Sequence, residues 1–181
     1  MSRLVALLRG INVGRAKRLH MADLRELMLA LGYVSVQTLL NSGNVLFSSK
    51  SGSATTHARR IATAIANDLG VTAQVVVVRA SDFGAVVAEN PLRAIASDSS
   101  RLLVAFTQTP DALHALTELT MSGWTPDMLA VGKRAAYVWC ANGILESKLA
   151  QSVNRKLGEL GTTRNWATVE KISALISQTV A

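Results

Sequence analysis

Residues 34–49 read VSVQTLLNSGNVLFSS. Two β-rich runs, residues 34–40 and 44–49, flank the tripeptide Asn41-Ser42-Gly43. Asparagine and glycine tolerate the left-handed backbone that a tight turn between two strands requires. The stretch therefore predicts a β-hairpin, and helical patterns on both sides of it place the hairpin at the centre of a mixed α/β unit.

Four more elements flank this hairpin. Before it, apolar residues at helical spacing over 24–31 predict a helix, and the apolar run 3–8 predicts a central strand. After it, we expect a helix that begins at Thr55 or Thr56, followed by a β-branched strand over 73–78. The order β-α-β-β-α-β is that of the ferredoxin-like, split βαβ fold.

The same order recurs in the second half of the chain. The expected elements are a strand over 101–106, a helix entered by Thr109-Pro110, strands over 128–131 and 135–140, a helix over 149–157, a short extended piece at 162–163 and a last helix from Asn165. We therefore predict an α/β (α+β) protein made of two tandem ferredoxin-like units with antiparallel sheets. The first unit is residues 1–95 with a linking helix, and the second is residues 96–181 with a C-terminal helix.

Composition places the chain among soluble globular proteins, with 49% hydrophobic and 17% charged residues. No apolar run approaches the roughly 20 residues of a membrane span, and we expect neither a signal peptide nor membrane association. The single cysteine, Cys140, forms no internal disulfide and fits a reducing cytoplasm.

Positive charge is concentrated near the N-terminus. The formal net charge is +7, and residues 1–50 hold seven Lys or Arg against two Asp or Glu. Clustered positive charge favours anionic partners, so we expect a phosphate-bearing small molecule or a nucleic acid. The alternative is that these cations only keep an apolar-rich chain soluble.

The predicted topology brings two polar loops together. In a split βαβ unit the first and second strands run parallel, so the loop after the first strand and the hairpin turn lie at the same edge of the sheet. Backbone amides and cations in such loops can hold an anion. The candidate ligand-binding residues are Arg9, Gly10, Asn12, Gly14, Arg15 and Lys17 from the first loop and Asn41, Ser42 and Asn44 from the turn. The alternative for the glycines is a tight turn that needs a positive φ.

Arg164 and Asn165 form another candidate anion site at the start of the last helix. The alternative is structural: Asn165 caps the helix, Trp166 packs, and Arg164 pairs with an acid such as Glu170.

Other chemistry is not indicated by the sequence. The three histidines, His20, His57 and His114, lie in separate elements, so we predict no metal site and no cofactor. No histidine base is placed beside Ser42 or Cys140, which leaves the catalytic residues of any enzyme unassigned.

Aromatic residues mark one face of the second predicted sheet. Tyr137 and Trp139 alternate onto one face of a strand, with Phe106 on the neighbouring strand. Such a face can stack RNA bases, but it more commonly forms a contact between domains or with a second copy of the chain.

Several motifs resemble the bacterial family known as domain of unknown function 1697 (DUF1697). They are Leu7-Leu8-Arg9-Gly10-Ile11-Asn12-Val13-Gly14 with Met21 and Leu24, Asn41-Ser42-Gly43-Asn44-Val45, Asn90-Pro91-Leu92, Ser147-Lys148-Leu149, and Thr162-Thr163-Arg164-Asn165-Trp166 with Val169. The resemblance implies two ferredoxin-like units and no assigned activity, catalytic residue or cofactor. The chain departs from the family pattern with Arg15 in place of a glycine, Asn41 in place of a glutamine, and Leu145-Glu146 in place of Gly-Arg.

The leading functional hypothesis is an anion-binding protein whose site lies between the Arg9–Lys17 loop and the Asn41–Asn44 turn. One alternative is a small metal-independent enzyme that uses Arg9, Asn12, Asn44, Arg164 and Asn165. The other is a dimerising interaction module whose exposed sheet face carries Tyr137 and Trp139.

Overall fold

The computed structural model describes residues 1–14 and 18–178. Its contacts divide the described chain into two compact units, residues 1–83 and residues 84–178. The division falls inside α3 (Ala80–Ala88), whereas the sequence places the boundary after residue 95. Each unit contains one four-stranded antiparallel sheet, which confirms the predicted fold class. None of the helices in the described part of the chain is long and apolar enough to cross a membrane.

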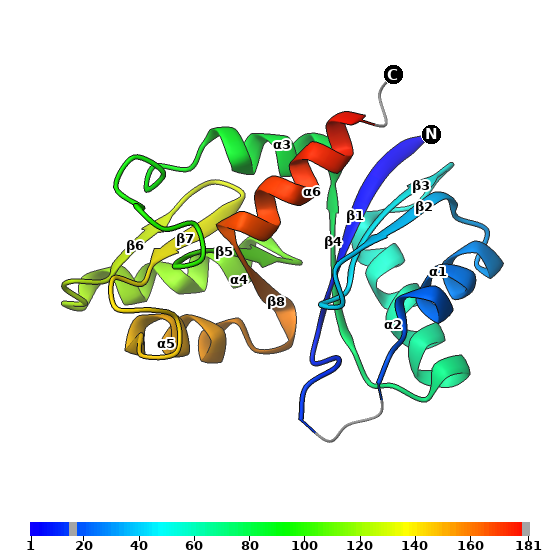
Figure 1. The fold of residues 1–181 in the computed structure, drawn as a ribbon, viewed down its shortest axis with the longest axis horizontal. Helices are drawn as coiled ribbons and strands as arrows, with labels where there is room; N and C mark the ends of the chain where they lie inside the picture. The colour runs from blue at the N-terminus through cyan, green and yellow to red at the C-terminus, as the bar shows by residue number, and fades with distance from the viewer. Residues whose placement is uncertain (15–17, 179–181) are drawn as a thin grey trace. The chain divides into compact units, whose positions relative to one another are not determined.

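The first unit has the predicted β-α-β-β-α-β order (Figure 1). Its elements are β1 (Ser2–Arg9), α1 (Met21–Ala30), β2 (Val34–Leu39), β3 (Asn44–Ser49), α2 (Ala54–Leu69) and β4 (Gln74–Arg79). The sheet order is β2-β3-β1-β4, so the N-terminal strand lies in the middle. Alternate residues of β1, namely Leu4, Ala6 and Leu8, join the core cluster beneath α1 and α2.

The edge strand β2 is irregular. Its register with β3 shifts between Val34 and Gln37, and Ser35 inside this interval has a φ of 52°. Only Gln37–Leu39 continue the ladder residue by residue up to the turn.

The second unit repeats the arrangement. Its elements are β5 (Leu102–Thr107), α4 (Pro110–His114), the 3₁₀ helix η1 (Ala115–Met121), β6 (Met128–Val131), β7 (Ala135–Trp139), α5 (Lys148–Leu157), the 3₁₀ helix η2 (Gly158–Leu160), β8 (Gly161–Asn165) and α6 (Trp166–Gln178). The sheet order β6-β7-β5-β8 matches that of the first unit. The helix predicted after Thr109 is therefore short, because it tightens into a 3₁₀ helix after one turn.

The starts of α2 and α4 follow short polar side chains that cap the helix. Ser53 precedes α2, and its Oγ accepts a hydrogen bond from the amide of Thr56 at 3.1 Å. The sequence expectation of Thr55 or Thr56 as the cap is wrong, because Ser53 has the extended backbone of an N-cap and both threonines already lie in the helix. Thr109 caps α4 in the same way, with Pro110 at the first helical position.

The aromatic face considered for the second sheet is not exposed, so the hypothesis of an exposed face that carries Tyr137 is wrong. Tyr137 is only 1% exposed, and its hydroxyl donates a hydrogen bond to the carbonyl of Val86 at 2.7 Å. Burial raises the pKa of Tyr137 to about 12. Phe106 is buried as well, and Trp139 is half-buried. Tyr137 is therefore held inside its unit by α3 and is not available to stack bases or to face a partner.

Candidate functional site

The β1–α1 loop and the β2–β3 turn meet at one edge of the first sheet, as the topology predicts. The amide of Leu8 donates to the carbonyl of Gly43 at 2.8 Å. The side chain of Asn12 donates to the carbonyl of Asn41 at 2.9 Å. Two segments about thirty residues apart in sequence are thus joined directly.

Asn12 holds the first loop in shape. Its Nδ2 also donates to the carbonyl of Leu19 at 3.0 Å, and its Oδ1 accepts from the amide of Leu19 at 2.8 Å. The residue has a φ of 56°, a left-handed conformation that asparagine tolerates better than most residues. The sequence places Asn12 among the ligand-binding residues, but its amide is already used by backbone groups of the protein.

Asn44 and Gly43 hold the β2–β3 turn in shape. Asn44 is 1% exposed, and its Nδ2 donates to the carbonyl of Leu39 at 2.8 Å and to the hydroxyl of Ser42 at 3.0 Å. Gly43 has a φ of 78°, and a Cβ at this position would lie 2.7 Å from side-chain atoms of Leu8 and Ile11. Both residues therefore shape the turn.

Between the two loops lies a cavity of about 430 Å³, here called the loop hollow. The polar residues of its lining are Asn12, Arg18, His20, Asn41 and Ser42. The cationic side chain of Arg18 and the imidazole of His20 are both exposed. The hollow thus presents four kinds of polar group to solvent: a guanidinium, an imidazole, an amide and a hydroxyl, from Arg18, His20, Asn41 and Ser42.

The N-terminus of α1 lies at the same hollow, since Met21 is part of its lining. His20 occupies the N-cap position in an extended conformation, and its side chain makes no cap hydrogen bond. The carbonyl of His20 accepts from the amide of Leu24 at 3.1 Å, as in an ordinary first turn. The first amides of a helix have no intrahelical acceptor, and the positive end of the helix dipole favours an anion.

The other residues that the sequence predicts for the anion site in the first loop are not part of the described lining of the hollow. Arg15 and Lys17 lie outside the described residues. Arg9 is half-buried at the end of β1, opposite Gln74, and is not part of the lining of the hollow. Gly10 and Gly14 have φ values of 79° and 61°, so both serve the turn conformation that was the alternative explanation for them.

Arg164 and Asn165 belong to the second unit. For Asn165 the structural alternative is correct, because this residue caps the last helix. Its Oδ1 accepts from the amide of Thr168 at 2.9 Å, which caps α6. Arg164 is 8% exposed and donates to the hydroxyl of Thr162 at 3.0 Å and to the carbonyl of Thr163 at 2.9 Å. Burial lowers the pKa of Arg164 to about 10. The expected partner Glu170 instead accepts a hydrogen bond from the indole of Trp166.

Sequence reasoning missed His20 and gave Arg18 no site role. Histidine is not a preferred capping residue, so the position before Met21 carried no helix-start signal. Two features could have indicated it: its place directly before a helical pattern, and its place in a loop predicted to reach the hairpin turn. No group of three or more His, Cys, Asp or Glu side chains within residues 1–14 and 18–178 is arranged to hold a metal ion.

The fold has a solved counterpart. The structure of conserved bacterial protein SP0830 from Streptococcus pneumoniae matches with a TM-score of 0.75 and 22% sequence identity, over 97% of this chain and 98% of that one. At this identity the match concerns the fold alone. No curated protein shows a significant match. The family described as "Protein of unknown function (DUF1697)" matches residues 1–137, and the chain therefore belongs to the DUF1697 family.

Proposed function

We propose that the first unit binds a small phosphate-bearing molecule in the loop hollow. The observation that carries this proposal is the start of α1, which lines a cavity and whose N-cap residue His20 makes no side-chain cap hydrogen bond. A phosphate group at a helix N-terminus accepts hydrogen bonds from its first amides and is favoured by the helix dipole.

The surroundings of the helix end support the same ligand. Arg18 adds a permanent positive charge, and Ser42 adds a hydroxyl from the opposite loop. Residues 1–50 carry a charge excess of five, which attracts anions to this part of the chain. Asn12 and Asn44 hold the loops in the shape that forms the hollow, so their role is positioning.

A small molecule fits better than a nucleic acid. The hollow of about 430 Å³ lies within the 300–1,000 Å³ range of small-molecule sites. Tyr137, a candidate residue for stacking bases, is buried. The alternative of a small metal-independent enzyme gains no catalytic arrangement from the described residues around the hollow.

Isothermal titration calorimetry with inorganic phosphate, nucleoside monophosphates and single-stranded RNA tests the proposal. The decisive variant is Arg18→Glu, which should weaken the best phosphate-bearing ligand at least about tenfold, since a charge-assisted contact contributes roughly 1.5–3 kcal/mol. The matched control is Arg79→Glu, which makes the same charge change at the other end of the sheet, where Arg79 is opposite Leu4.

Three results would contradict the proposal. The first is no saturable binding of any phosphate-bearing small molecule. The second is equal loss of affinity in Arg18→Glu and Arg79→Glu, because this indicates overall charge and not a site. The third is binding of RNA alone with a steep salt dependence, which indicates contacts to the phosphate backbone over a wider surface.

A further inference from the structure

A second cavity lies in the second unit, on the side of the sheet where α5 begins. It measures about 310 Å³ and is here called the Trp124 pocket. Its walls come from the segment between η1 and β6, which includes Trp124 and Asp127, and from the segment between β7 and α5, which includes Gly143 and Glu146. It shares no residue with the loop hollow of the first unit.

The floor of the Trp124 pocket is held by a hydrogen-bond network. Asp127 accepts through Oδ1 from the amide of Ala141 at 2.9 Å and through Oδ2 from the hydroxyl of Ser147 at 2.6 Å. Ser147 is 3% exposed, and its Oγ also accepts from the amide of Ala150 at 2.9 Å as the N-cap of α5. An ionised carboxylate has about four acceptor positions, so Asp127 keeps capacity for a donor that enters the pocket.

Side chains of opposite charge flank Ser147 at the start of α5. Glu146 and Lys148 both line the pocket and are both exposed. Within the described part of the chain neither side chain has an ion pair or a hydrogen bond. The pocket thus presents two carboxylates, those of Asp127 and Glu146, together with one ammonium group. This combination complements a ligand that itself carries both charges.

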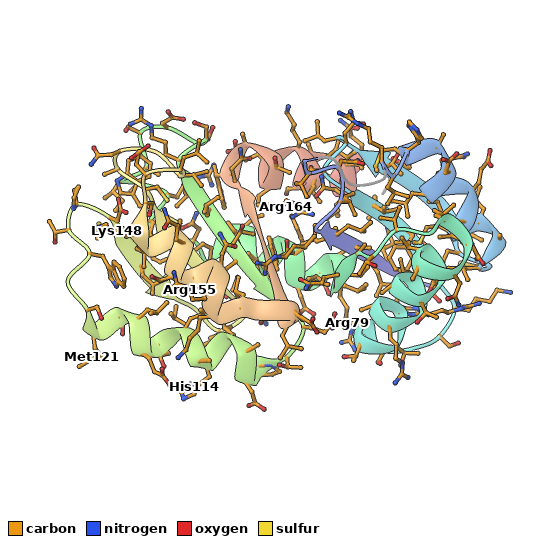
Figure 2. The ribbon with its side chains drawn as sticks, turned by 90° about the horizontal axis from the view of Figure 1, so that it is seen from below. Arg79, His114, Met121, Lys148, Arg155 and Arg164 are labelled. Carbon is orange, nitrogen blue, oxygen red and sulfur yellow. The ribbon has the colours of Figure 1, made fainter. Side chains whose placement is uncertain are left out.

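Apolar groups complete the pocket. The indole of Trp124 is fixed because its Nε1 donates to the carbonyl of Leu119 at 2.6 Å. Met121 at the end of η1 and Leu145, which directly precedes Glu146, are each 89% exposed, and neither is part of the lining. Figure 2 shows Met121 and Lys148 at the same end of the second unit.

We propose that the Trp124 pocket binds a small zwitterion with an apolar side chain, which is the chemistry of an apolar amino acid. The ammonium group lies against Asp127 and Glu146, and the carboxylate lies against Lys148 at the positive end of α5. The apolar side chain packs on Trp124. The volume of about 310 Å³ is at the lower end of small-molecule sites, which suits a single amino acid and not a peptide.

The test uses three probes that differ by one charged group. L-phenylalanine carries both groups, phenethylamine lacks the carboxylate, and 3-phenylpropionate lacks the ammonium. We expect L-phenylalanine to bind with a dissociation constant below about 1 mM and each analogue to bind at least about tenfold more weakly, measured by calorimetry. The indole NMR signal of Trp124, assigned with Trp124→Phe, should shift on binding.

Two exposed residues allow each charge to be removed without disturbing the fold. Glu146→Gln should weaken L-phenylalanine about tenfold and leave 3-phenylpropionate unchanged, whereas Lys148→Gln should weaken L-phenylalanine and leave phenethylamine unchanged. Glu159→Gln and Lys133→Gln make the same changes outside the pocket and should have no effect.

The proposal is overturned if L-phenylalanine does not saturate the protein up to about 10 mM, a concentration at which even a weak specific site is filled. It is also overturned if phenethylamine binds as well as L-phenylalanine, or if Glu146→Gln and Lys148→Gln behave like their controls. Because the two cavities share no residue, these results are independent of phosphate binding in the loop hollow.

Discussion

The hydroxyl of Tyr33 and Nδ1 of His57 lie 2.9 Å apart in the core of the first unit. Both side chains are almost fully buried, at 2% and 4% exposure. The guanidinium of Arg60 lies 5.5 Å from the centre of the Tyr33 ring. Burial lowers the pKa of His57 below its usual range, and the positive charge of Arg60 lowers it further.

Stability should therefore fall in mild acid. In the unfolded chain His57 titrates near pH 6.5, whereas in the folded protein it stays neutral to a lower pH. As the pH falls below about 6.5 the unfolded state takes up the proton first, so the free energy of unfolding decreases. Urea unfolding at pH 7.5, 6.5 and 5.5 measures this slope. His57→Gln should flatten it, and His114→Gln, at an exposed position, should not; equal slopes in the two variants would count against the assignment.

Gly43→Ala should destabilise the first unit more than Gly10→Ala. Both glycines have a positive φ, which costs an L-residue about 1–2 kcal/mol. Only at Gly43 would the new Cβ also collide with Leu8 and Ile11, and such overpacking costs about 1–3 kcal/mol more. Urea denaturation of the two variants gives the difference directly. If both variants lose the same free energy, Gly43 does not pack as closely against Leu8 and Ile11 as a distance of 2.7 Å requires.

Asn12→Asp should open the β1–α1 loop although the side chain keeps its size. The new carboxylate cannot donate to the carbonyls of Leu19 and Asn41, and it faces their oxygens. We expect a loss of about 1–3 kcal/mol in the free energy of unfolding. Hydrogen exchange at the Leu19 amide should also become faster. Asn67→Asp, on the exposed surface of α2, is the control and should leave both quantities unchanged.

Tyr137→Phe should lower the stability of the second unit by about 1 kcal/mol, because it removes a buried hydrogen bond to the carbonyl of Val86. The ring remains, so the effect reports the hydroxyl alone. Thermal unfolding followed by near-ultraviolet circular dichroism measures it. An unchanged midpoint would mean that α3 is not held to the sheet by this contact.

The order of elements could be predicted from sequence because each element carries its own signal. Strand β1 is a short apolar run, α2 shows helical spacing, and the hairpin has its Asn-Ser-Gly turn. The split βαβ topology alone then predicts that the β1–α1 loop and the β2–β3 turn lie at the same edge of the sheet. The start of α2 was misplaced because Ser53, Thr55 and Thr56 are all good caps, and only the backbone conformation distinguishes them.

The chemistry of the site was harder to predict, because it depends on which polar groups are already paired. Asn12 and Asn44 have the composition of ligand-binding residues, yet their amides bond to carbonyls seven and five residues away, respectively. A sequence does not reveal such pairing, since it depends on loop conformation. His20 is the opposite case, because it lines the cavity although the sequence did not predict it as a site residue. It belongs to no capping pattern, and only the shape of the loop places it beside the cavity.

The irregular strand β2 limits how copies of this protein can assemble. An exposed edge strand can recruit a strand of another molecule through its free amides and carbonyls, which leads to open-ended aggregation. Here the displaced backbone around Ser35 interrupts that row, leaving a regular stretch only over Gln37–Leu39. Three residues are too few to template a stable foreign strand, so this edge is protected against sheet extension by its own backbone.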